Sequence, residues 1–279
     1  MRLVRFGAPG SERPGLLDAQ GVVRDASSVV EDWAGPHLNP DRLAGLRRLD
    51  PADLPAAPDK TRVAAPIPRP SKVVCVGLNY ADHVRETGFE PPTEPLVFLK
   101  SPTALSGPFD PIRIPKTAGA VDWEVELACV IGREARRLTR ADALSVVAGF
   151  AVANDVTDRG WQFDRGGQWS KAKSADTFMP LGPWLVPTGE LRDFPRRSIW
   201  LTKNGTRRQD SVLGQLVFTV EEILSHLTEF MTLLPGDLVL TGTPPGVAYN
   251  KPTPDYLKPG DLISCGIDGL GAQSTEVWT

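Results

Sequence analysis

The sequence has little cysteine, with three residues among 279. Cys75, Cys129 and Cys265 are an odd number, lie far apart, and each falls within an apolar stretch typical of a buried strand. Small secreted domains need paired cysteines as a framework, whereas a chain of this length buries a core without them. We therefore exclude a disulfide scaffold and expect reduced thiols in the core.

Long apolar runs and an excess of charge of one sign are also absent. No uncharged run approaches the roughly 18 to 20 residues that span a bilayer, and Met1 to Phe6 lack the apolar core of a signal peptide. The 31 basic and 34 acidic residues leave a net charge of −3, too little to attract a polyanion. We expect a cytoplasmic protein whose partners include neither nucleic acid nor membrane.

Proline, by contrast, is abundant, and six of its 27 residues fall between Asp50 and Pro70. Proline cannot continue a helix or a central strand, so this stretch predicts an extended connector. Before it, short apolar pieces alternate with turn residues, as in a small β meander. We predict a small N-terminal β-rich domain over residues 1–65, a catalytic domain over residues 71–279, and no sheet that crosses the connector.

Strand-like runs dominate the catalytic segment. They cover residues 72–78, 96–99, 111–114, 121–131 and 150–157. Helical patterns are few: residues 139–147, residues 219–230 with a capping box at Thr219 and Glu222, and a short helix opened by Asn39. Without repeats or an alternating βα pattern, a doubly wound sheet and a βα barrel are disfavoured. We predict a mixed α/β fold that is mostly β.

Two glutamates in the strand-like run from Val121 indicate a binding site. Glu124 and Glu126 alternate with apolar residues, so on a strand both carboxylates face the same side. At a separation of about 7 Å, two ionised carboxylates repel each other unless a cation or a basic side chain lies between them. The alternative is an exposed strand face with both charges in water.

The next strand-like run is apolar until it reaches Asp155 near its end. A buried strand that ends in a carboxylate indicates a site rather than a solvated surface. Together, Glu124, Glu126 and Asp155 offer only oxygen ligands, with no suitable cysteine or histidine between them. This donor set fits Mg²⁺ or Mn²⁺ and argues against Zn²⁺.

Three more side chains are candidates for catalysis. His83 and Glu86, three residues apart in a short helical stretch, would share a face, and a carboxylate that fixes the tautomer of a histidine prepares it as a general base. A surface histidine beside a glutamate is the structural alternative. Lys173 is either a site residue or a solvated loop cation.

Five segments together resemble the fumarylacetoacetate hydrolase family. They are GLNYADHVRETG from Gly77, DWEVEL from Asp122, NDVTDRGWQ from Asn154, AKS from Ala172 and TGTPPGV from Thr241, in the family's order. The first 70 residues resemble the smaller domain of longer members, and GGQW and DTF resemble a bacterial subgroup labelled ureidoglycolate lyase or diketo-deoxy-sugar-acid hydrolase. The arginine-rich substrate loop of the eukaryotic enzymes has no counterpart, so fumarylacetoacetate itself is a poor candidate substrate.

The resemblance implies a β-roll of mixed sheets, usually a homodimer, and a role for each site residue. The implied roles are metal ligands for Glu124, Glu126 and Asp155, a catalytic pair on a mobile lid for His83 and Glu86, a substrate-facing lysine for Lys173, and substrate binding for Arg159, Gln162 and Thr243. A short helix with few apolar residues has little burial to hold it, so we expect the lid to be mobile without ligand.

The expected reaction is hydrolysis of the C3–C4 bond of a 2,4-dioxo acid, an acylpyruvate, to pyruvate and a second acid, with Mg²⁺ or Mn²⁺ as cofactor. Alternatives that keep the metal are decarboxylation, isomerisation of the 2-hydroxyhepta-2,4-diene-1,7-dioate type, and elimination of urea from ureidoglycolate. An alternative of another class is a non-catalytic ligand-binding or assembly module. The complete set of carboxylates, histidine and lysine argues against that module.

Overall fold

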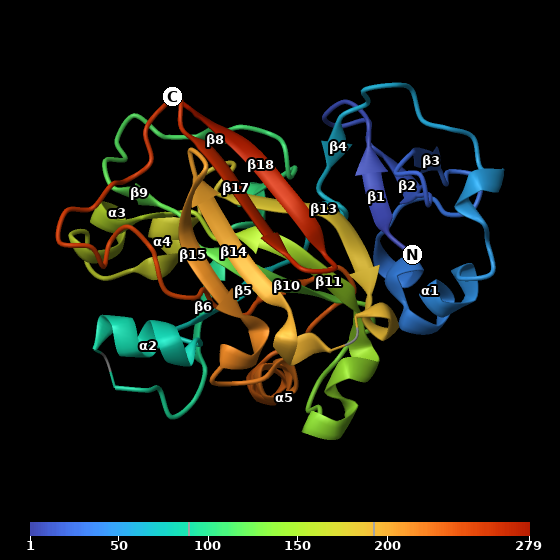
Figure 1. Ribbon diagram of the computed structural model, residues 1–279. Coiled ribbons are helices and arrows are strands. Elements are labelled where there is room, and N and C mark those ends of the chain that lie inside the picture. The colour runs from blue at the N-terminus through green and yellow to red at the C-terminus, as the bar shows by residue number, and fades with distance from the viewer. Residues whose placement is uncertain (89, 192) are drawn as a thin grey trace.

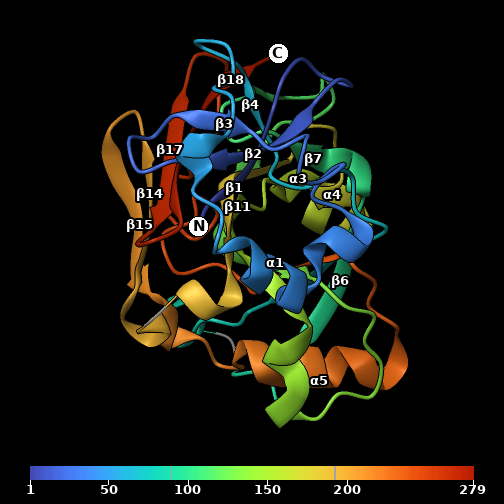
Figure 2. The same cartoon turned by 90° about the vertical axis from the view of Figure 1, so that its right-hand side faces the viewer.

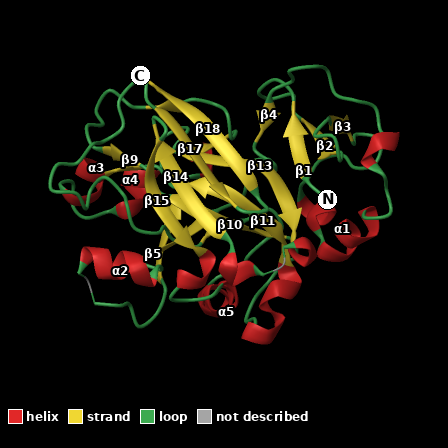
Figure 3. Ribbon diagram, viewed as in Figure 1, coloured by secondary structure: helices red, strands yellow, loops and turns green. Residues whose placement is uncertain are grey.

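The computed structural model describes residues 1–88, 90–191 and 193–279, and strands make up most of its regular structure (Figures 1 and 3). The strands are β1 (Leu3–Phe6), β2 (Arg13–Leu17), β3 (Val23–Asp25), β4 (Val63–Ala64), β5 (Val73–Gly77), β6 (Leu96–Lys100), β7 (Leu105–Ser106), β8 (Ile112–Arg113), β9 (Val121–Asp122), β10 (Val125–Ile131), β11 (Val147–Asn154), β12 (Thr157–Asp158), β13 (Met179–Pro187), β14 (Ser198–Lys203), β15 (Thr206–Val212), β16 (Leu238–Leu240), β17 (Leu262–Ile267) and β18 (Gly271–Trp278).

Helices are short. The α-helices are α1 (Pro40–Leu46), α2 (Ala81–Thr87), α3 (Arg159–Phe163), α4 (Trp169–Lys173) and α5 (Val220–Phe230), and the 3₁₀ helices are η1 (Gly35–Leu38), η2 (Pro51–Asp53), η3 (Pro102–Ala104), η4 (Arg140–Val146), η5 (Thr188–Glu190), η6 (Phe194–Arg196) and η7 (Leu213–Gln215). The predicted capping box of α5 is present, and the segment after Thr139 is the 3₁₀ helix η4 rather than an α-helix. Among the described residues, no helix is long and apolar enough to cross a membrane.

Two mixed sheets carry the fold. The larger has 11 strands in the order β3-β2-β1-β13-β11-β10-β16-β5-β6, with β4 beside β1 and β7 beside β13. The smaller has five strands in the order β15-β14-β17-β18-β8, and β12 pairs with β9. Gln273 on β18 joins the two sheets, since its buried amide donates to the carbonyl oxygens of Val152 at 2.7 Å and Pro180 at 3.1 Å. The prediction of a mostly β mixed fold with few helices is confirmed.

The N-terminal segment packs on one side of the molecule, at the right in Figure 1 and towards the viewer in Figure 2. Its three strands form the predicted meander, with β1 antiparallel to β2 and β2 antiparallel to β3. However, β1 also pairs with β13 through Leu3 and Leu185, so the large sheet does cross the connector. The prediction of an uncrossed connector is therefore wrong.

The reason for this crossing is burial. Leu3, Trp33 and Leu38 are fully buried in one apolar core that they share with β10, β11 and β13. The connector itself supplies β4, which pairs with β1. The domain boundaries at residues 65 and 71 stay a prediction. In the structure, the segments on either side of the connector pack into one apolar core. Within this core the three cysteines are free and buried, as predicted.

Candidate active site

Strand directions bring the sequence motifs to one place. Because β5 and β16 are parallel, the segments that follow them, from Leu78 and from Thr241, leave the sheet at the same end. Asn79 joins these segments, since its amide donates to the carbonyl oxygens of Thr241 at 2.8 Å and Phe218 at 3.1 Å. Gly242 has a φ of +98° and a Cβ there would lie 2.9 Å from that of Asn79, so only glycine fits.

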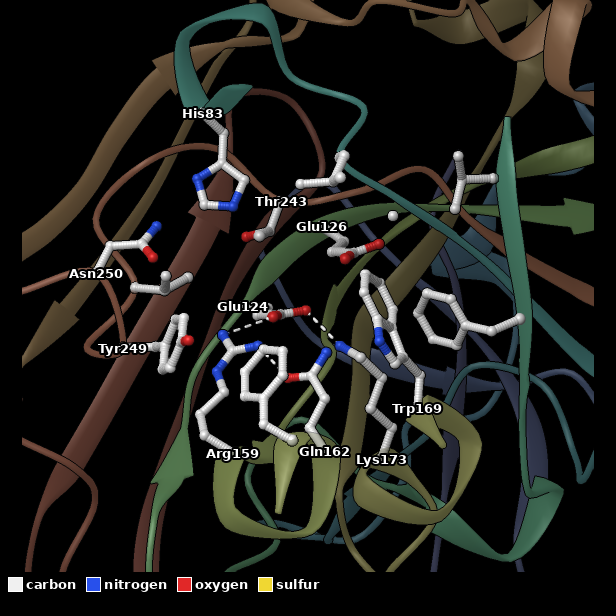
Figure 4. Close-up of a pocket in the computed structure, with 16 residues that line it drawn as sticks. His83, Glu124, Glu126, Arg159, Gln162, Trp169, Lys173, Thr243, Tyr249 and Asn250 are labelled. Atoms are coloured by element: carbon white, nitrogen blue, oxygen red, sulfur yellow. Dashed lines mark hydrogen bonds and ion pairs between the residues drawn. The ribbon is translucent and has the colours of Figure 1, made fainter. Parts of the chain in front are cut away.

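The first two carboxylates lie where the predicted strand from Val121 is interrupted. Strand β9 ends before Trp123 and β10 begins at Val125, and at the break the Glu124 N–H donates to the side-chain oxygen of Asn154 at 2.9 Å. Glu124 and Glu126 still face the same cavity (Figure 4). They are only 7% and 2% exposed, so the alternative of a solvated strand face is excluded.

Asp155 completes a cluster of three carboxylates. It directly follows β11, and its N–H donates to the carbonyl oxygen of Glu124 at 2.8 Å. One carboxylate oxygen from each of Glu124, Glu126 and Asp155 lies within 4.8 Å of the others, and all three residues are buried. The structure therefore brings the predicted ligand set together.

Basic side chains neutralise part of this cluster. Lys173 lies 2.6 Å from Glu124 and 2.7 Å from Asp155, and Arg159 lies 2.7 Å from Glu124. Lys100, fully buried at the end of β6, pairs with the other oxygen of Asp155. Burial alone would raise the pKa of Asp155, but Lys100 and Lys173 outweigh that effect and lower it.

Glu126 is different, because no basic side chain among the described residues lies within ion-pair distance of it. Its carboxylate accepts the Gly242 N–H at 2.8 Å. Burial, together with the charges of Asp155 and Glu124, raises the pKa of Glu126 well above its ordinary value. A hard divalent cation would supply the missing positive charge and takes oxygen ligands, so the residues present fit Mg²⁺ or Mn²⁺.

The predicted histidine pair forms on α2. The Nδ1 of His83 lies 3.2 Å from the Glu86 carboxylate, and the ring faces the cavity (Figure 4). Only 8% of His83 is exposed, so the alternative of a surface histidine is excluded. The carboxylate can hold the imidazole in one tautomer and orientation.

Glu86 also connects α2 to the loop formed by residues 246–251. It accepts hydrogen bonds from the Gly246 N–H at 3.1 Å, the Lys251 ammonium at 3.0 Å and the Asn250 amide at 3.4 Å, and we call Glu86 with these three residues the α2 latch. Burial raises the pKa of Glu86, but the bonds from His83 and from the latch lower it to about 2. The sequence predicted few contacts for this helix, because the latch comes from residues 160 or more positions away.

The predicted substrate-binding residues meet beside the carboxylates. Arg159 and Gln162 are buried on α3, and the guanidinium donates to the Gln162 oxygen at 2.9 Å. Asp122, also buried, accepts from Arg159 at 2.9 Å. Thr243 lines the cavity, and its hydroxyl donates to the Val125 carbonyl at 2.9 Å.

A cavity of about 280 Å³ unites these groups (Figure 4). Of the predicted site residues, those that line it are His83, Glu124, Glu126, Arg159, Gln162, Lys173 and Thr243. Glu86 lies behind His83, and Asp155 lies beneath the carboxylates with no exposed surface.

Several functional residues were missed from the sequence. Lys100 is a second basic partner of Asp155 beside Lys173, Asp122 holds Arg159, and Trp169 and Tyr249 line the cavity. The one signal for Lys100 in the sequence was its position at the end of an apolar strand-like run. A lysine in that position is equally typical of a strand that ends in water. Asp122 opens the DWEVEL motif, but its position in the sequence gave no sign that it pairs with Arg159.

A sequence model for the family described as "Fumarylacetoacetate (FAA) hydrolase C-terminal" matches residues 72–278. The chain belongs to the fumarylacetoacetate hydrolase family. A Burkholderia multivorans relative, whose name refers to a hydrolase and specifies no substrate, is 48% identical over 98% of this chain and 97% of its own. Matches to solved structures agree with the family assignment.

Two of these solved structures bear on the reaction. Maleylpyruvate hydrolase from Sphingobium sp. SYK-6 is 30% identical with a TM-score of 0.81, covering 100% of this chain and 99% of its own. The 2-hydroxyhepta-2,4-diene-1,7-dioate isomerase from Mycobacterium marinum is 32% identical with a TM-score of 0.74, covering 100% and 98%. Both hydrolases and isomerases of this family therefore share the fold.

Proposed function

We propose that the protein is a divalent-metal-dependent hydrolase that cleaves the C3–C4 bond of a 2,4-dioxo acid, giving pyruvate and a second acid. The observation that carries the proposal is the cavity itself, in which Glu124 and Glu126 of the all-oxygen cluster face the carboxylate-bound His83, with Asp155 buried next to them. Family membership and the hydrolase name of the Burkholderia relative support an enzyme.

Mg²⁺ or Mn²⁺ is the proposed cofactor, with Glu124, Glu126 and Asp155 as its ligands. When bound, the ion supplies positive charge to the enolate of the leaving pyruvate and a template for the substrate carboxylate and 2-oxo oxygen. Arg159 holds Glu124 in place and, although burial lowers its pKa, the charges of Glu124 and Asp122 raise it, so the guanidinium stays charged.

His83 is the proposed general base. It takes a proton from the water that attacks C4 and, once the C3–C4 bond has broken, returns it to C3 of the pyruvate enolate. Glu86 orients the ring and stabilises the imidazolium between these two proton transfers. Lys173 is the proposed donor to the oxyanion that forms at C4. Burial lowers the pKa of Lys173, but Asp155 and Glu124 outweigh that effect and raise it, so the ammonium keeps its protons. Its three N–H groups bond Glu124, Asp155 and Thr157, and one of these bonds is exchanged when Lys173 donates to the oxyanion.

Arg159, Gln162 and Thr243 are the proposed substrate-binding residues, since all three line the cavity. The alternatives that keep the same metal and enolate are a decarboxylase, an isomerase and ureidoglycolate lyase. The isomerase alternative is favoured by the Mycobacterium marinum neighbour. A homodimer with a cytoplasmic location stays part of the proposal.

The experiment is a screen of 2,4-dioxo acids, including sugar-acid-derived ones, with and without Mg²⁺ or Mn²⁺, in which pyruvate is measured. We expect pyruvate and the second acid in equal amounts and only with metal. Release of CO₂ or urea, or a rearranged substrate without pyruvate, would instead identify one of the alternatives.

A further inference from the structure

The cavity has an apolar side that the proposed reaction leaves unused. Resting on the proposed function, we propose that this side binds an uncharged, apolar acyl group, so that the protein prefers 2,4-dioxo acids with a neutral end over those that end in a second carboxylate.

Trp169 lines one flank of the cavity, beside Lys173 and opposite Tyr249 in Figure 4. Its ring meets Phe98 edge to face, with the centroids 5.3 Å apart. A Cβ on Gly77 would lie 2.6 Å from the indole, so glycine at this position leaves the slot that the ring fills. The indole is therefore held in place by packing and offers a flat apolar surface.

The mouth of the cavity is also aromatic. Phe163 on α3 stacks against Tyr249, with the ring centroids 4.7 Å apart, and each residue is 43% exposed. Val76, Leu78 and Val247 complete the apolar lining. An acyl group that extends outward from the carboxylates therefore has Trp169 on one flank and the stacked Phe163 and Tyr249 on the other.

The positive charges of the cavity are already engaged. Within the described part of the chain, its basic lining residues are His83, Arg159 and Lys173. Arg159 pairs with Asp122 and Glu124, Lys173 pairs with Glu124 and Asp155, and His83 contacts Glu86. In the proposed reaction His83 and Lys173 serve the reacting carbonyl, and the charge of Arg159, one of the proposed substrate-binding residues, is balanced by Asp122 and Glu124.

Apart from Glu124 and Glu126, the remaining polar lining residues, Gln162, Thr243, Tyr249 and Asn250, are neutral. A second carboxylate on the substrate would lose its water against apolar rings. The cations nearest to those rings are Lys173, 5.1 Å from the Phe98 ring, and Arg159, 5.8 Å from the Tyr249 ring, and both are already paired with Glu124. An unpaired charge in such a place is costly, whereas an apolar group there gains from burial. Discrimination between the two substrate classes follows from this difference.

The test compares two ligands of equal length, 2-oxohexanoate and 2-oxohexanedioate, by calorimetry with Mg²⁺. Both carry the 2-oxo acid group, and neither has the 4-oxo group that the proposed hydrolysis requires. We expect 2-oxohexanoate to bind at least about tenfold more tightly, within the range that apolar pockets achieve. Equal affinity, tighter binding of the dianion, or no binding of either acid would overturn the inference.

Two variants and a control locate the effect. Trp169→Ala should weaken 2-oxohexanoate binding about tenfold and leave oxalate binding unchanged, and Phe163→Arg should reduce the preference by placing a cation at the mouth. Phe230→Ala, which removes an exposed aromatic of α5 outside the cavity, is the control. If both cavity variants keep the wild-type preference for 2-oxohexanoate over 2-oxohexanedioate, the apolar side does not bind the acyl group and the inference is wrong.

A turnover assay separates this inference from the proposed function. Pyruvate release is compared for 2,4-dioxohexanoate and 2,4-dioxoheptanedioate. If the calorimetric preference is found but neither dioxo acid yields pyruvate, the proposed hydrolysis fails while the apolar acyl side stands. If both yield pyruvate and the dianion reacts faster, the hydrolysis stands and the inference fails.

Discussion

At the scale of single residues, Glu126 is the carboxylate that most needs a metal ion. It is buried beside Glu124 and Asp155 without a basic partner of its own, which raises its pKa. An ionised Glu126 therefore costs stability at neutral pH, and that cost is removed by a bound cation or by loss of the charge. The residue links stability to metal binding.

We predict that Glu126→Gln abolishes metal-dependent activity and keeps the fold. The amide still accepts the Gly242 N–H but carries no charge, so the metal-free variant should melt no lower than the wild type and gain nothing from added Mg²⁺. Thermal melts with and without metal measure this, with the exposed Glu134→Gln as control. Wild-type turnover of Glu126→Gln at limiting metal would refute the ligand assignment.

The lowered pKa of Glu86 predicts a pH dependence. Because this pKa falls from its ordinary 4.5 to about 2, the stabilisation by the ionised carboxylate is complete above pH 4.5 and is lost as the pH falls towards 2. Urea unfolding should show Glu86→Gln to be less stable than the wild type at neutral pH, with a difference that shrinks below pH 4.5. A difference independent of pH would argue against the ionised latch.

Residue identity and spacing were enough to predict the carboxylate trio and the histidine pair, because strand alternation and helical spacing are local. They were not enough to place Lys100 or Asp122. A lysine at a strand end is buried only when another strand delivers a carboxylate beside it, and Asp155 does so from 55 positions away.

At the scale of elements, α2 depends on a loop far along the chain. Lys251 pairs with Glu86 and is itself half exposed, so the bond adds little to overall stability but connects the helix to residues 246–251. We therefore expect the helix that carries His83 to loosen more readily than the core.

We predict that Lys251→Met speeds hydrogen exchange of the α2 amides and leaves exchange in β10 and β11 unchanged. Oxalate with Mg²⁺, a mimic of the chelating substrate, should slow α2 exchange by adding contacts to the proposed lid. The exposed Lys258→Met serves as control. Equal α2 exchange in wild type and Lys251→Met, together with no effect of oxalate, would show that α2 is not a lid.

Element type was predictable where a pattern was long or carried its own cap, as in α5 and in α1, which Asn39 caps. The prediction of element type failed where hydrogen bonds from other elements override the local conformational preference. The run from Val121 breaks at Glu124 because the side chains of Asn154 and Gln209 take the N–H groups of Glu124 and Val125. Such partners come from other strands and leave no local signal.

At the scale of the whole molecule, the N-terminal segment is part of one core. Leu3 is fully buried and lies opposite Leu185 across the β1 and β13 pair. Proline spacing predicted a connector over residues 50–70, but it could not show that β1 completes the large sheet. That pairing joins residues 182 positions apart.

We predict that Leu3→Ala lowers the free energy of unfolding by about 2–5 kcal/mol and shifts one cooperative transition of the whole chain. Truncation leaves a cavity in the shared core, whereas the control Leu262→Ala removes a leucine that is 42% exposed. Circular dichroism and tryptophan fluorescence during unfolding measure this. An early separate transition that spares the catalytic segment would support two independent domains.

Pyruvate release by wild type and His83→Ala, at saturating Mg²⁺ on the best 2,4-dioxo acid from the screen, tests the central claim most directly. That claim is that His83, held by Glu86, activates water beside the Glu124, Glu126 and Asp155 cluster. The account predicts a loss of turnover of about 10² to 10⁴ in His83→Ala, the usual share of a general base, with metal and oxalate affinity almost unchanged. Turnover retained at the wild-type rate would contradict it.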